Sequence, residues 1–197
     1  MKSQLIVLAL LLSSIIPMSA QTRLGTVPWE IYWYRSAADS LLLGDDYING
    51  SVIIKSPWAS SLTCLKCHFN LYPNKCELRY LVYDRKSRDI TTYRCPVPED
   101  IFDEVSDLIE SAVYSSVPDN YGAGIDAPCI YFYWYEFSAM CDWPPKQDGD
   151  NCDRLVSLIS KVMDAVKDND LESIEKLRPE IKSLTEIFNE LRAAVEG

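Results

Sequence analysis

The residues from Leu62 to Cys95 alternate between apolar and polar side chains in three extended runs, and this pattern restricts the fold more than any other feature of the chain. The runs cover about 62–72, 76–83 and 90–93, and short polar segments separate them. Period-two alternation in runs rich in Tyr, Val, Ile and Thr predicts β-strands joined by tight turns. We therefore expect an antiparallel meander.

Helical periodicity follows the meander and also occupies the end of the chain. The first helix is expected to begin at Pro98, where a proline and two acids suit a helix N-terminus. Residues 150–197 carry two apolar stripes on either side of a polar turn, which predicts an antiparallel helical hairpin with Asp150 or Asn151 as its cap. Pro179 should kink the second helix or begin a new one.

The second helix of this hairpin carries an apolar seam of coiled-coil type. Its residues recur at alternating three- and four-residue steps: Ile174, Leu177, Ile181, Leu184, Phe188, Leu191 and Val195. The simpler interpretation is that the hairpin packs on the sheet. Formation of a homodimer through the C-terminal helix is the alternative.

The segment Cys129–Phe137 is the most hydrophobic stretch after the N-terminal 20 residues, and it predicts a central strand that is covered on both faces. The expected fold class is α+β, an antiparallel β-sheet with one mid-chain helix and a C-terminal antiparallel helical hairpin. We expect residues 21–197 to form a single α+β domain. Residues 21–145 would supply the sheet and the first helix, and residues 150–197 the hairpin packed on it.

The first 20 residues have the pattern of a secretory signal peptide. Lys2 precedes an apolar run from Leu5 to Leu12, and small residues end the segment before Gln21. The apolar run is too short to span a membrane, so we expect a secreted or periplasmic protein with no stable membrane insertion. In this general plan the chain resembles small exported bacterial proteins of unknown function, a resemblance that assigns no residue a role.

The charge balance restricts the class of partner. The full chain has a formal net charge of −10, with 19 basic and 29 acidic residues. Without the single lysine of the leader the charge is −11, which would repel nucleic acid and anionic membranes. We therefore expect a protein or glycan partner and no nucleic acid.

All seven cysteines follow the leader, which in an oxidising compartment favours disulfides and leaves one cysteine over. If the turn between the second and third strands is centred on 85–86, Cys76 faces Cys95 across the hairpin, and we expect this pair to be bonded. We also expect a bond between Cys141 and Cys152 that closes a short polar loop.

The only histidine follows two cysteines in the sequence Cys64-Leu-Lys-Cys67-His68. This C-x-x-C-H motif resembles the attachment site of c-type cytochromes, and the resemblance implies haem c bound through Cys64 and Cys67 with His68 as axial ligand. Read as a strand, the segment places the two cysteines on opposite faces. We then expect a disulfide framework, in which Cys64, Cys67 and Cys129 supply a third bond and the odd thiol, and no cofactor.

The remaining residues favour binding over catalysis. His68 is the only imidazole available to a catalytic triad, and no serine lies in a nucleophile elbow. Tyr131, Tyr133 and Tyr135 would share one strand face, where they either fill the core or stack on a sugar ring. We expect a non-catalytic binding or interaction module without a metal site; a mono-haem electron carrier is the alternative.

Overall fold

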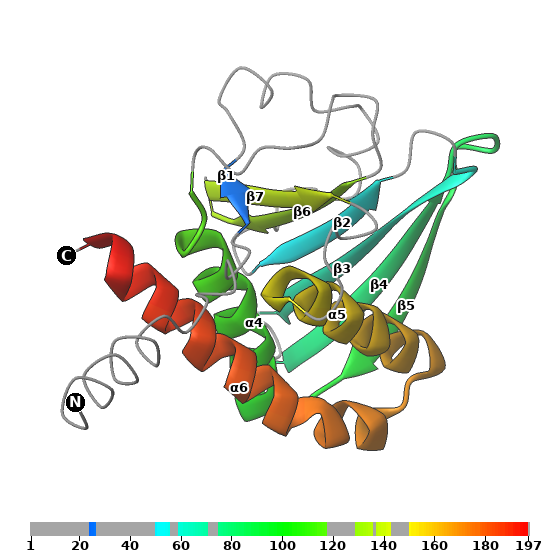
Figure 1. The fold of residues 1–197 in the computed structure, drawn as a ribbon. Helices are drawn as coiled ribbons and strands as arrows, with labels where there is room; N and C mark the ends of the chain where they lie inside the picture. The colour runs from blue at the N-terminus through cyan, green and yellow to red at the C-terminus, as the bar shows by residue number, and fades with distance from the viewer. Residues whose placement is uncertain are drawn as a thin grey trace, which may run out of the picture.

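The structure is a computed structural model that describes residues 24–26, 50–55, 59–70, 75–117, 129–135, 137–142 and 150–196. The predicted leader and the loop between Cys141 and Cys152 fall mostly or entirely outside these residues. Seven strands and three helices are labelled in Figure 1: β1 (Gly25–Thr26), β2 (Ser51–Lys55), β3 (Ser61–Asn70), β4 (Lys75–Asp84), β5 (Ile90–Pro96), α4 (Glu99–Tyr114), β6 (Cys129–Trp134), β7 (Phe137–Asp142), α5 (Asn151–Asp168) and α6 (Leu171–Glu196).

The strands form one antiparallel sheet, and the predicted α+β class is confirmed. β2 to β5 pair in sequence order, and the run 62–95 forms the expected meander as β3, β4 and β5. After α4 the chain returns to the other side of β2, which gives the strand order β1-β7-β6-β2-β3-β4-β5. The meander therefore lies at one end of the sheet, with β5 as its last strand.

The segment expected to be one central strand, Cys129–Phe137, is a hairpin. β6 ends at Trp134, which pairs with Phe137 at the start of β7. Tyr135 in the turn has a φ of +51°, a conformation that sequence patterns do not assign to an aromatic residue. β6 itself lies inside the sheet between β7 and β2, as its apolar character predicts.

The turn between β4 and β5 sets a register that differs from the predicted one. Asp84 donates its backbone N–H to the carbonyl of Asp89 at 3.0 Å, so four residues form the loop. Its carboxylate accepts the N–H groups of Lys86 and Ser87, and Arg88 closes the loop with a φ of +65°. The turn is thus centred on 86–87, and the prediction of a turn centred on 85–86 is wrong.

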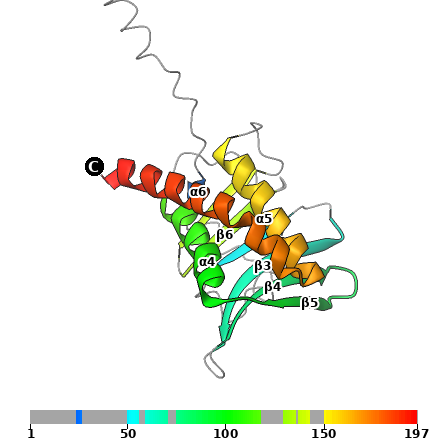
Figure 2. The ribbon, with the colours of Figure 1, turned by 90° about the horizontal axis from the view of Figure 1, so that it is seen from below.

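The three helices cover one face of the sheet (Figure 1). α4 contacts β3, β4, β6 and β7, α5 contacts β4 and β5, and α6 lies across both of these helices (Figure 2). The α6 seam faces the same chain, because Ile174, Ile181 and Leu184 are fully buried in the core between helices and sheet. At these three positions the seam packs within its own chain.

Two features explain how α5 and α6 form. Asp150 caps α5, and its carboxylate accepts the N–H of Asp153 at 2.8 Å. Pro179 lies within α6, which continues as one helix from 171 to 196, so a new helix does not begin there. Proline cannot donate a hydrogen bond to the carbonyl of Glu175, and Glu175 lies on an exposed turn of the helix. None of the described helices is long and apolar enough to cross a membrane.

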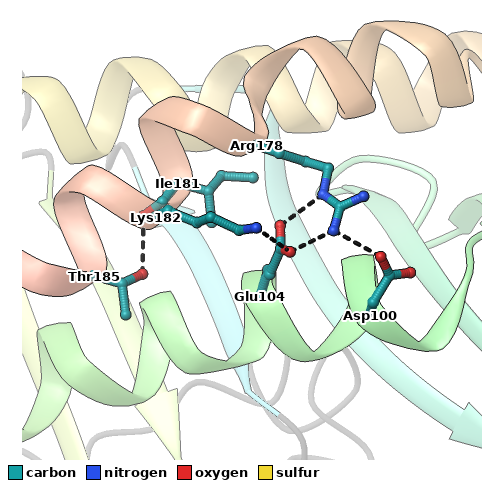
Figure 3. A network of polar contacts seen from close by, with 6 residues as sticks. All are labelled: Asp100, Glu104, Arg178, Ile181, Lys182 and Thr185. Carbon is teal, nitrogen blue, oxygen red and sulfur yellow. Dashed lines mark hydrogen bonds and ion pairs between the residues drawn. The ribbon is translucent and has the colours of Figure 1, made fainter.

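Ion pairs and hydrogen bonds between charged side chains link α6 to α4 (Figure 3). Arg178 donates from Nε to Glu104 at 2.8 Å and from its terminal nitrogen to Asp100 at 2.6 Å. Lys182 adds an ion pair to Glu104 at 3.0 Å. The bonds from Arg178 hold the pKa of the Glu104 carboxyl below its usual range. These contacts join the two helices at their solvent-facing side.

Candidate functional site

The cysteine–histidine motif lies within strand β3, and its two cysteines lie on opposite faces of the sheet. Cys64 and Cys67 are both fully buried in β3, Cys64 in a small cluster on the face opposite the helices and Cys67 in the main core. Two thiols on opposite faces of a continuous sheet cannot both reach one porphyrin edge. Burial raises the pKa of the Cys67 thiol to about 12, which keeps it a protonated, unreactive core side chain.

His68 belongs to a charged group on the face opposite the helices. It pairs across the ladder with Glu77, and its Nε2 lies 4.0 Å from the Glu77 carboxylate. Arg79 donates from Nε to the same carboxylate at 2.6 Å. His68 and Arg79 thus lie on either side of one carboxylate, that of Glu77.

All seven cysteines lie in the described residues, and each is a thiol that forms no disulfide there. The register places Cys95 opposite Leu78, and Cys76 is two residues further along β4. Diagonal neighbours on adjacent strands lie about 7–8 Å apart, beyond the Cα separation of a disulfide. The predicted Cys76–Cys95 geometry is therefore wrong, while the Cys141–Cys152 bond and the use of Cys129 stay predictions.

The structure separates the three predicted stacking aromatics. Tyr131 and Tyr133 share the face opposite the helices and stack on each other, with ring centroids 6.1 Å apart. Tyr133 is only 4 % exposed, so its ring is not an open platform. Tyr135 lies in the β6–β7 turn and is exposed, but it packs edge-on against Trp134. The three rings do not form one surface.

The register reveals a site that sequence reasoning missed. One row of side chains crosses six strands on the face opposite the helices, and every member is polar. The row, in spatial order from β7 to β5, is Ser138, Tyr133, Ser51, Lys66, Arg79 and Arg94. We call these six residues the polar row. It supplies three hydroxyl groups and three cations and contains no acid.

The basic end of the polar row puts like charges directly opposite one another. Lys66 pairs with Arg79, and Arg79 pairs with Arg94. Side chains in direct cross-strand pairs lie about 5 Å apart, and like charges there are destabilising by roughly 0.2–1 kcal/mol per pair. Glu77 offsets part of this cost at Arg79, and Lys66 also has an interaction of its own. The like-charge pair of Arg79 and Arg94 is therefore the part of the row that stability alone does not favour.

The polar row changes from buried at its centre to exposed at β5. Ser51 is fully buried, and its hydroxyl has no hydrogen-bond partner among the residues that the structure describes. Lys66 is 4 % exposed, whereas Arg94 is exposed, and its side chain makes no ion pair with the described residues. A ligand would thus reach the row from its β5 end.

The charge of the surrounding segment also favours an anion at the β5 end of the polar row. Residues 61–96 contain seven basic and three acidic side chains, a net charge of +4 in a chain whose total is −10. The acids lie mainly elsewhere, including on the helices. At physiological ionic strength charges are screened beyond about 8 Å, so an anion close to β4 and β5 experiences mostly the local positive charge.

Comparisons with known proteins add no assignment to this geometry. A scan against protein-family models, a search of curated proteins and a search of solved structures each found no match.

Proposed function

We propose that the protein is an exported, non-catalytic binding module whose partner carries an anionic group, and that this group binds at the basic end of the polar row. The observation that carries the proposal is the alignment of Lys66, Arg79 and Arg94 on three neighbouring strands. A bound anion would convert the repulsion between Arg79 and Arg94 into attraction.

The chemistry of the row suits recognition of an anion. Arginine offers a planar set of donors that match a carboxylate, sulfate or phosphate, and Arg94 has its donors available. Since Arg79 already bonds to Glu77, we assign Arg94 the direct contact and Arg79 a supporting positive charge. Export rests on the leader pattern of residues 1–20 and on the number of cysteines.

The proposal is tested by titration with poly-L-glutamate at physiological ionic strength, with neutral dextran as the uncharged control. The Arg94→Gln variant should bind at least tenfold more weakly, since a hydrogen bond to a charged group contributes about 1.5–3 kcal/mol. Arg88→Gln is the matched control, because it removes the same charge from the β4–β5 turn, about 20 Å along the strand. Equal affinities for wild type and both variants would refute the proposed function.

A further inference from the structure

β5 is the last strand of the sheet and offers an open edge. Among the described residues it pairs with β4 alone, and Figure 2 shows it at the outer end of the meander. An edge strand carries unpaired N–H and C=O groups that can accept another strand. The hydrogen bonds at its two ends establish which residues direct these groups outward.

Alternate residues of β5 face outward. Asp84 donates to the carbonyl of Asp89 at 3.0 Å, and Val97 donates to the carbonyl of Cys76 at 3.1 Å. The alternation of an antiparallel ladder then directs the odd-numbered residues of β5 toward β4 and the even-numbered ones away from it. The outward set is Ile90, Thr92, Arg94 and Pro96. Pro96 has no N–H, which is tolerated because its nitrogen lies on the open side.

The side chains of the same outward residues lie on the face of the polar row. Arg94 is the last member of that row, and Ile90 and Thr92 precede it at two-residue steps. All three are exposed, Ile90 by 38 %. A strand added to β5 would therefore meet the cation Arg94 first, then the small polar Thr92 and then the apolar Ile90.

We propose that the partner is an acidic polypeptide segment that adds to β5 as an eighth, antiparallel strand. This inference rests on the proposed function and specifies its partner. Read from N- to C-terminus, the segment would place an acid opposite Arg94, a small polar residue opposite Thr92 and an apolar residue opposite Ile90. Antiparallel addition continues the arrangement of the sheet, in which every pair of strands is antiparallel.

Charge favours such a segment over a second copy of this chain. Two copies that paired through β5 would bring together two segments of 61–96, each with a net charge of +4. The opposite face of the β5 edge already carries negative charge, since the charge of Asp170 helps to raise the pKa of Cys95 and that of Asp164 the pKa of Tyr80. That face is therefore less suited to an acid. The acid of the partner is therefore expected on the face of the polar row.

The test uses the acetylated and amidated peptide Ser-Glu-Ser-Thr-Ser-Val-Ser and an NMR titration of the full chain. In one version of the peptide the amides of Glu, Thr and Val are N-methylated. In the matched version the N-methyl groups are on the amides of the three serines that follow Glu, Thr and Val. The first set should lose binding by more than tenfold, because these amides face β5. The second set should bind like the unmodified peptide, because its amides point away.

A substitution in the protein provides the reciprocal test. Thr92→Pro removes an outward N–H without affecting the ladder to β4, and it should abolish peptide binding, whereas Thr92→Val should preserve it. Thermal unfolding would verify that both variants fold. Equal tolerance of the two methylation patterns, or binding of dextran sulfate but not of the peptide, would overturn the inference. If binding of poly-L-glutamate still depended on Arg94, the proposed function would stand.

Discussion

The hydroxyl of Ser51 gives the clearest prediction about stability, because it is completely buried and has no hydrogen-bond partner in the described part of the chain. An unsatisfied buried polar group costs about 1–3 kcal/mol. Ser51→Ala removes this cost and leaves only a small void, so the free energy of unfolding should rise by roughly 1 kcal/mol. In a chain of this size that corresponds to an increase in Tm of about 2–4 °C.

A second buried serine supplies the control. Ser115 is also fully buried, but its hydroxyl donates to the carbonyl of Ala112 at 3.0 Å. Ser115→Ala should therefore lower the free energy of unfolding by about 0.5–1.5 kcal/mol, opposite in sign to Ser51→Ala. Both values come from urea unfolding, with equal m-values as the check on two-state behaviour. A loss of stability in Ser51→Ala equal to that in Ser115→Ala would refute the reasoning.

Three further predictions concern the helices. Arg178→Gln should lower the free energy of unfolding in urea at pH 7; because the Glu104 pKa is depressed in the folded state, the difference from wild type should shrink as pH falls through that pKa, and a difference independent of pH would contradict the assigned bond. Burial and the neighbouring Asp107 raise the pKa of Glu110, so wild-type stability declines as pH rises through that pKa. Glu110→Gln should therefore increase the Tm at pH 7 and leave it unchanged well below the usual glutamate pKa. An equal increase in Tm at both pH values would contradict this cause. Asn169 ends α5 with a φ of +53°, so Asn169→Ala should cost about 1 kcal/mol while Asn169→Gly stays close to wild type, and thermal unfolding of the two variants would expose any reversal.

The elements of the fold could be predicted where one face of a periodic segment is buried. The alternation in 62–95 and the stripes of 150–197 correctly indicated the meander and the helical hairpin. The hairpin within Cys129–Phe137 could not be predicted, because its turn uses Tyr135 at positive φ in place of glycine. Pro179 permitted two outcomes, and the packing of one continuous α6 across α4 and α5 selected between them.

The candidate site could not be predicted because it depends on the register of neighbouring strands. A turn centred on 85–86 would place Arg79 opposite Thr92, and the three cations would not align. The observed loop aligns Arg79 with Arg94, because the Asp84 carboxylate organises the turn and Arg88 adopts positive φ. A two-residue shift in register thus both separates Cys76 from Cys95 and assembles the basic end of the polar row.

The most direct test of the central claim is the shift in Tm that poly-L-glutamate produces in wild type and in Arg94→Gln. A ligand at 100 times its Kd stabilises the folded state by about 2.7 kcal/mol, which corresponds to several degrees. The proposed function predicts this shift for wild type and for Arg88→Gln, and a much smaller one for Arg94→Gln. Without the polymer, Arg94→Gln should be at least as stable as wild type, because it loses a like-charge pair. An equal shift in all three proteins, or no shift in wild type, would contradict the claim that the basic end of the polar row binds an anionic partner.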